Sequence, residues 1–129
     1  MSKLVDECYY NNTRIALKLI ENKANIDLKD NYGDTALTWS CFYNNTEIAL
    51  KLIENKANLD IQNNNNCTAL EYVCSALAYV CNNNNITIAL KLIENKANLD
   101  IQNKHRQTIL SCLCENNNTK ISSCLLEMY

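Results

Sequence analysis

The chain has 129 residues, of which 47% are hydrophobic and 20% are charged, and its formal net charge is −2. These proportions are those of a globular domain, so they predict a single domain with a buried core and argue against wholesale disorder. No block of lysine or arginine occurs along the chain. We therefore expect neither nucleic acid nor an acidic membrane surface as a partner.

The first residues, "MSKLVDECYYNNTR", contain Asp6 and Glu7 and lack the apolar run of a signal peptide. No stretch of the chain approaches the roughly 20 apolar residues that a membrane span requires. In the absence of a secretory signal, the eight cysteines are expected to be free thiols in a reducing compartment. The sequence therefore predicts a soluble, cytoplasmic protein.

The chain repeats itself. "IALKLIENKANIDLKD" begins at Ile15, and "IALKLIENKANLDIQN" begins at Ile48 and again at Ile88. The first two copies are 33 residues apart and the last two are 40 apart, so the third unit carries an insertion of seven residues. A period of 33 with two helices per unit is typical of a helical repeat protein.

Each unit is predicted to contain two helices joined by a turn. The first helices are expected to begin after Thr35, Thr68 and Thr108, because a threonine oxygen can accept from the exposed amides there. Asn44 is expected in the turn, because asparagine tolerates the left-handed conformation. The second helix follows, with an apolar stripe that faces a neighbour. In the second unit this stripe is Ile48, Ala49, Leu52 and Ile53.

The loops before the first helices are predicted to be hairpin turns. Gly33 serves one turn, and Asn66 and Arg106 stand in its place in later units. Asn66 suits a positive φ, whereas Arg106 would destabilise its turn by about 1 kcal/mol or distort it. One aspartate recurs per unit at the end of each loop and is interpreted as part of the hairpin geometry: Asp27, Asp60 and Asp100.

The insertion lies in "EYVCSALAYVCNNNN", where Tyr72-Val73-Cys74 is followed seven residues later by Tyr79-Val80-Cys81. We expect the first helix of the third unit to be longer by about 10 Å. Residues 82–85 would then lead the chain back to the second helix. Two alternatives remain open. Tyr79 and Val80 form an uncovered docking point, or the segment folds back and shields Phe42, Tyr43 or Leu113.

The cysteines and the histidine do not form a reactive site in this interpretation. Cys8, Cys41 and Cys114 fall at equivalent places, and Cys74 and Cys81 are alternatives for that place in the third unit. These cysteines are expected to fill the core, while Cys67 in a hairpin is expected to be the most exposed thiol. The cysteine spacing does not suit zinc. His105 has no partner carboxylate or nucleophile implied beside it. We therefore expect no enzyme activity, no metal and no cofactor.

The segment "DNYGDTALTWSCFYNNTEIALKLIENKANLD", residues 30–60, resembles an ankyrin repeat. The family's Thr-Pro-Leu-His appears as Thr35-Ala36-Leu37-Thr38, and its Leu-Leu-x-x-Gly-Ala-Asp-Val-Asn appears as residues 52–60. The resemblance implies an all-α helical solenoid, a stack of helix-turn-helix units with short hairpin loops. It covers the chain as a single domain of four units, 1–30, 31–63, 64–103 and 104–129.

The chain departs from the family pattern at two kinds of position. Lys23, Lys56 and Lys96 replace the glycine that ends the second helix, and one alternative is that each helix stops one residue earlier, at an asparagine. The histidine of the family motif is absent, which weakens the usual polar contact inside each repeat.

The resemblance also implies a binding surface, formed by the hairpin tips and the exposed side of the first helices. Trp39 occupies a place that is usually packed and is expected in the core. The residues carried over to the surface are aromatic in the first two units and polar in later ones. The set expected to bind a partner is Tyr9, Tyr10, Tyr32, Asp34, Phe42, Tyr43, Tyr79, Lys104, His105 and Gln107, with Asn31, Asn65, Cys67 and Glu115 beside them.

The function implied by the resemblance is protein–protein interaction, as an adaptor, an inhibitor or a targeting module. The partner is expected to be another protein of unknown identity. The alternative is a structural subunit that assembles with itself through outward leucines on the second helices: Leu17, Leu50 and Leu90. A monomer with weak self-association is the expected state.

Overall fold

The computed structural model describes the backbone of residues 3–79 and 83–108 and the side chains of residues 4–74 and 86–108. These ranges contain six α-helices and no strand. The helices form three pairs: α1 (Lys3–Tyr9) with α2 (Thr13–Glu21), α3 (Ala36–Phe42) with α4 (Thr46–Glu54), and α5 (Ala69–Tyr79) with α6 (Asn83–Glu94).

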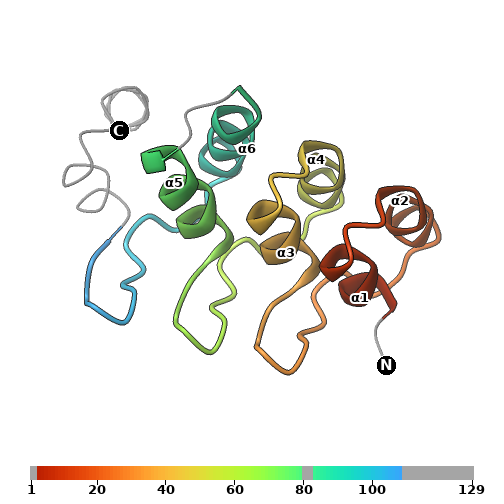
Figure 1. Ribbon diagram of the computed structural model, residues 1–129, viewed down its shortest axis with the longest axis horizontal. Coiled ribbons are helices and arrows are strands. Elements are labelled where there is room, and N and C mark those ends of the chain that lie inside the picture. Colours follow the sequence, from red (N-terminus) through yellow and green to blue (C-terminus); the bar gives the residue numbers. More distant parts are fainter. Residues whose placement is uncertain (1–2, 80–82, 109–129) are drawn as a thin grey trace.

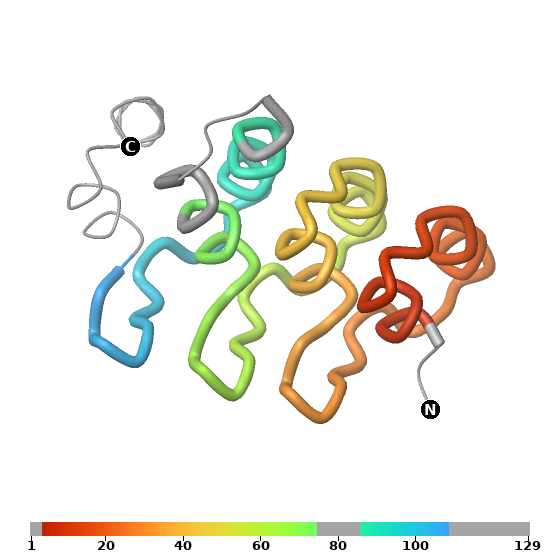
Figure 2. The backbone as a smooth tube through the Cα atoms, viewed as in Figure 1, coloured from red at the N-terminus to blue at the C-terminus, as the bar shows by residue number. Residues whose placement is uncertain are grey.

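The pairs stack side by side in two layers. Helix α3 packs between α1 and α5, and α4 packs between α2 and α6 (Figure 1). The loops between pairs project from the same side of the stack, next to the layer of first helices (Figure 2). This arrangement confirms the predicted all-α solenoid. None of the helices within the described ranges is long and apolar enough to span a bilayer.

The first helices begin as predicted after Thr35 and Thr68, and the start expected after Thr108 lies outside the described residues. Thr35 is the N-cap of α3, and its Oγ1 accepts from the Thr38 amide while the Thr38 Oγ1 accepts from the Thr35 amide. Thr68 directly precedes α5, and its hydroxyl accepts from the Glu71 amide at 3.4 Å. These side chains satisfy amides that the first turn of a helix leaves without partners.

The second helices end at Glu21, Glu54 and Glu94, and an asparagine caps α2 and α4. The lysine that follows the capping asparagine has a left-handed backbone, with φ of 62° at Lys23 and 65° at Lys56. The lysine takes both the place and the backbone conformation of the family's glycine, so these helices do not stop earlier than in the family pattern. The Lys56 amide donates to the carbonyl of Ile53, as a Schellman motif requires.

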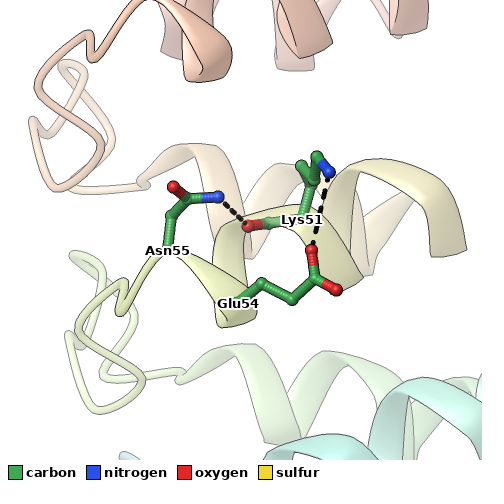
Figure 3. Close-up of polar contacts among 3 residues, drawn as sticks. All are labelled: Lys51, Glu54 and Asn55. Atoms are coloured by element: carbon green, nitrogen blue, oxygen red, sulfur yellow. Dashed lines mark hydrogen bonds and ion pairs between the residues drawn. The ribbon is translucent and has the colours of Figure 1, made fainter.

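The capping asparagine of α4, Asn55, makes a side-chain contact at the end of the helix. The Asn55 Nδ2 donates to the Lys51 carbonyl at 2.8 Å, while the Lys51 ammonium lies 3.6 Å from the Glu54 carboxylate (Figure 3). The same two contacts recur at the end of α6 between Lys91, Glu94 and Asn95. The ion pairs are exposed, so each stabilises its helix by only a few tenths of a kcal/mol.

The core runs between the two layers. The predicted stripe of α4 is buried, and so is its copy in α6, which is Ile88, Ala89, Leu92 and Ile93. Cys8, Cys41 and Cys74 are at most 3% exposed, which confirms that these thiols fill the core. Leu17, Leu50 and Leu90 are half-buried, so the second helices do not present fully outward leucines.

The insertion lengthens both helices of the third unit. Helix α5 has 11 residues against 7 in α3, and α6 has 12 against 9 in α4, which accounts for four and three of the seven inserted residues. The prediction that the first helix takes up the whole insertion is wrong, because residues 83–85 begin α6. The packing of Tyr79 and Val80 lies outside the described side chains.

Neighbouring loops are joined by hydrogen bonds. The Asp27 carboxylate accepts from the Asn58 amide at 2.9 Å, and Asp60 accepts from Asn98 at 2.7 Å. The repeated aspartate is therefore an inter-unit contact as well as part of the loop. Gly33 has φ +79°, and a Cβ there would lie 2.9 Å from the backbone nitrogen of Asn64 in the next loop.

Candidate functional site

Three series of equivalent residues lie along the first helices. Residues 33 apart in sequence occupy the same place in successive units, so Tyr9 corresponds to Phe42 and Tyr10 to Tyr43. Trp39 of α3 corresponds to Tyr72 of α5 by the same spacing. Helices α1, α3 and α5 lie side by side (Figure 1). Ring contacts join the side chains of neighbouring helices into one continuous aromatic surface.

We call this surface the aromatic cluster, and Trp39 lies at its centre. The Trp39 ring centroid is 4.9 Å from Tyr9, 5.4 Å from Phe42 and 6.0 Å from Tyr43. Most of the pairs are edge-to-face, a favourable geometry that stabilises each pair by about 0.5–1.5 kcal/mol. The cluster comprises Tyr9, Tyr10, Tyr32, Trp39, Phe42, Tyr43 and Tyr72.

The cluster is largely open to solvent. Tyr10 is 69% exposed, Tyr32 62% and Phe42 54%, and Tyr9 and Tyr43 are each 39% exposed. Trp39 is half-buried: it packs against the core, as expected, and the rest of its side chain lies among the surface aromatic rings. The indole is at the surface because its nitrogen bonds to a loop residue and because aromatic rings surround it.

A hydrogen bond from the preceding loop orients each central ring. The Trp39 Nε1–H donates to the Asp30 carboxylate at 2.7 Å, and Asn63 Nδ2 lies 2.6 Å from the Tyr72 hydroxyl oxygen. In both contacts the loop residue stands nine positions before the ring, so Asp30 and Asn63 occupy the same position of their loops. An acceptor, Asp30, faces the indole, which can only donate, whereas Asn63 donates to a hydroxyl that can accept.

Asp34 lies beneath the cluster and is only 4% exposed. Its carboxylate accepts from Asn63 Nδ2 at 3.0 Å, so it contacts the next loop. Burial raises the pKa of Asp34, hydrogen bonds from Asn63 and Thr38 oppose the rise, and the nearby Asp30 charge adds to it. Asp34 was expected at the binding surface, but its side chain supports that surface from below.

Two hollows open beside the cluster. The Asp6 hollow, of about 370 Å³, is lined by Asp6, Tyr9, Tyr10, Asp30, Asn31 and Tyr32. The Trp39 hollow, of about 390 Å³, is lined by Tyr9, Tyr32, Asp34, Trp39, Asn63, Asn64, Asn65 and Tyr72. Tyr9 and Tyr32 line both, and none of the described side chains that line them belongs to a lysine, an arginine or a histidine.

The remaining predicted residues lie away from the aromatic cluster. Lys104 and His105 are exposed in the last described loop, and the Gln107 amide donates to Asn103 Oδ1 at 3.0 Å. Cys67 is half-buried in the second loop. Tyr79 is the last residue of α5, with its side chain outside the described set, and Glu115 lies beyond the described residues.

Tyr72 was missed as a surface residue by sequence reasoning. The signal was present, because Tyr72 stands nine residues after Asn63 as Trp39 stands nine after Asp30. Among the side chains that the structure describes, no group of three or more potential metal ligands converges.

A sequence model described as ankyrin repeats (3 copies) matches residues 4–78. Comparison with curated proteins found no match. Ankyrin repeats are generally protein–protein interaction modules and are typically non-enzymatic. The matched region contains the aromatic cluster, and the helix pairs of the structure follow the same repeat. From its repeats and its fold, this chain belongs to the ankyrin repeat family.

Proposed function

We propose that this protein binds another protein through the aromatic cluster, as an adaptor, an inhibitor or a targeting module. The observation that carries the proposal is the exposure of five large aromatic side chains on one continuous surface. Monomeric proteins rarely expose large apolar patches without a binding role. Tyrosine, tryptophan and phenylalanine are also the residues enriched at the centres of interfaces.

The cluster is also preorganised for binding. Trp39 is held by Asp30, and Tyr72 is held by Asn63, so the rings at its centre have little freedom to lose. The loops themselves are tied together by hydrogen bonds, including Asn64 N to the Tyr32 carbonyl at 2.9 Å. A surface that is already ordered binds with a smaller entropic penalty than a flexible one.

The test is capture of the native partner by two variants that remove a similar exposed apolar area. Phe42 is 54% exposed in the cluster, and Ile15 is 50% exposed on α2 in the other layer. Phe42→Ser should reduce binding of the captured partner at least about tenfold, as interface anchors do, whereas Ile15→Ser should leave it unchanged. Equal binding by the wild type and Phe42→Ser would refute this use of the cluster.

Light scattering separates this function from the self-assembling subunit. We propose a monomer, because the leucines expected to drive self-association are half-buried. A stable oligomer that Phe42→Ser dissociates would instead assign the cluster to contacts between copies. We also propose a cytoplasmic location, which suits the free, buried thiols of Cys8, Cys41 and Cys74.

A further inference from the structure

The Asp6 hollow combines aromatic walls with negative charge. Tyr9 and Tyr10 meet edge to face at 5.0 Å with an interplanar angle of 84°, and Tyr32 meets Trp39 at 82°. Rings set nearly perpendicular to one another present both faces and edges to a shared space. The faces of such rings attract cations.

The carboxylates of the hollow have unequal surroundings. Asp30 accepts from the amides of Tyr32 and Asp34 and from the Trp39 indole, so hydrogen bonds already hold it in place. The Asp6 carboxylate makes no hydrogen bond or ion pair with any side chain that the structure describes, and it is half-buried. Among the side chains that the structure describes, residues 4–74 and 86–108, no basic group lines the hollow or pairs with either carboxylate.

A partner that covers the aromatic cluster would also cover this hollow, because Tyr9 and Tyr32 belong to both. Covering a carboxylate with an apolar surface removes its hydrating water without replacing those hydrogen bonds, which is unfavourable. Removing water is tolerated when a cation pairs with the carboxylate. The neighbouring Asp34, buried beside the second hollow, adds to the negative field.

We propose that the Asp6 hollow receives a positively charged side chain, arginine or lysine, from the bound partner protein. The proposal rests on the proposed function and adds to it the chemistry of the partner. The cation lies between the rings of Tyr9, Tyr10 and Tyr32 and pairs with Asp6, while the apolar neighbours of that side chain cover Trp39 and Phe42.

The test uses the only tryptophan of the chain, Trp39, whose fluorescence reports on the adjacent rings. The probes are N-acetyl-arginine amide and N-acetyl-lysine amide. Their uncharged counterparts, N-acetyl-citrulline amide and Nα,Nε-diacetyl-lysine amide, have similar shapes. We expect at least one cationic probe to give a saturable change and to bind about fivefold or more tighter than its uncharged counterpart, with the difference shrinking at high salt.

Variants identify the site. Asp6→Asn keeps the shape of the side chain and should weaken the cationic probes severalfold, and Asp6→Lys should abolish the response. Glu21→Lys makes the same charge change at an exposed position at the end of α2 and should retain full binding. Circular dichroism verifies that each variant is folded. If Asp6→Lys is unfolded, the result for the isosteric Asp6→Asn decides the test.

Equal binding of charged and uncharged probes, no saturable response, or a response unchanged in Asp6→Asn would overturn the proposal. The native partner provides a separate measurement. If Phe42→Ser releases that partner but Asp6→Lys does not, the aromatic cluster still binds protein and the cationic contact is refuted. If neither variant releases it while the cationic probes bind through Asp6, the hollow is a cation site and the proposed function fails.

Discussion

At the scale of single residues, the turns contain non-glycine residues in the left-handed backbone conformation, which is unfavourable for most side chains. Within the described chain, left-handed φ angles occur at Asn11, Lys23, Asn44, Lys56, Asn66, Lys96 and Arg106. Asparagine tolerates this region, whereas lysine and arginine are strained there by about 1 kcal/mol each relative to glycine. Arg106 keeps a φ of 61°, so the turn accepts the strain without changing shape.

Replacing Lys56 with glycine should therefore stabilise the protein by about 1 kcal/mol, because glycine adopts φ 65° without steric strain. Urea unfolding followed by circular dichroism measures the change. Lys51→Gly is the matched control inside α4, where the same substitution should destabilise by about 1 kcal/mol. A Lys56→Gly variant no more stable than the wild type would show that the lysine is not strained.

The buried carboxyl of Asp34 should make stability depend on pH. Burial raises its pKa above the ordinary 3.8, so the folded protein holds this proton more tightly than the unfolded chain. Its contribution is therefore greatest below pH 3.8 and falls as the pH rises through the folded-state pKa. Asp34→Asn does not titrate, so its stability relative to the wild type should increase from acid to neutral pH.

Urea midpoints of both proteins at several pH values between about 3 and 7 measure this difference. Glu71→Gln should show a trend of the same sign, because burial also raises the pKa of Glu71. Parallel curves for wild type and Asp34→Asn would contradict the expected titration of Asp34.

At the scale of elements, identical helices have different surroundings. Helices α2 and α4 share the letters IALKLIE, yet Ile15 is 50% exposed while Ile48 is 1% exposed and Ile88 is 0% exposed. Helix α4 packs against α2, and α6 packs against α4. Ile48 and Ile88 are buried where each of these helices packs against the preceding one. Helix α2 is the first described helix of its layer, so no preceding helix of that layer covers Ile15.

Ile48→Ala should therefore destabilise the protein by about 2–5 kcal/mol, because it leaves a cavity between helices. Ile15→Ala removes the same atoms from an exposed place and should cost less than about 1 kcal/mol. Chemical unfolding of the two variants under the same conditions checks this pair. Equal losses would mean that Ile15 is covered in solution.

The hydrogen bond between the loop and the following first helix also recurs from the second unit to the third, although the residues that form it differ. Asp30 faces an indole in the second unit, and Asn63 faces a phenol in the third. The loop residue and the ring change together, so the contact persists although both identities differ. The element that presents the aromatic cluster is therefore the loop with its following helix, rather than the helix alone.

At the scale of the whole molecule, the insertion lengthens α5 and α6, while α5 still packs against α3 and α6 against α4. Residues 76–82 can be deleted to restore the 33-residue spacing while keeping Val73, Cys74 and Ile88, which are buried. We expect this deletion to change the free energy of unfolding by less than about 2 kcal/mol, because contacts between neighbouring units supply most of the stability.

Deletion of residues 43–49, at the equivalent place in the second unit, is the control. It removes Ile48 and Ala49 from the core and should unfold the protein. Circular dichroism and thermal unfolding distinguish the two outcomes. An unfolded 76–82 deletion would show that the added turns are part of the cooperative core.

The sequence by itself determined the repeat, the helix starts at the threonines, the apolar stripes and the buried cysteines. It also marked five aromatic residues that prove to be exposed: Tyr9, Tyr10, Tyr32, Phe42 and Tyr43. The helix starts and the apolar stripes depend on residues within a few positions of one another, through capping and periodicity, so local sequence is sufficient to predict them. The exposed aromatics instead followed from the family resemblance, which assigns the same places in successive units to the surface.

Only the tertiary structure decided which side chains meet across units. It placed Trp39, which packs against the core, at the centre of the aromatic cluster, buried Asp34 and divided the insertion between α5 and α6. It also exposed Ile15 while burying Ile48 in an identical stretch of sequence. The physical reason is that exposure depends on what neighbouring units cover, and residues 33 positions away supply that cover.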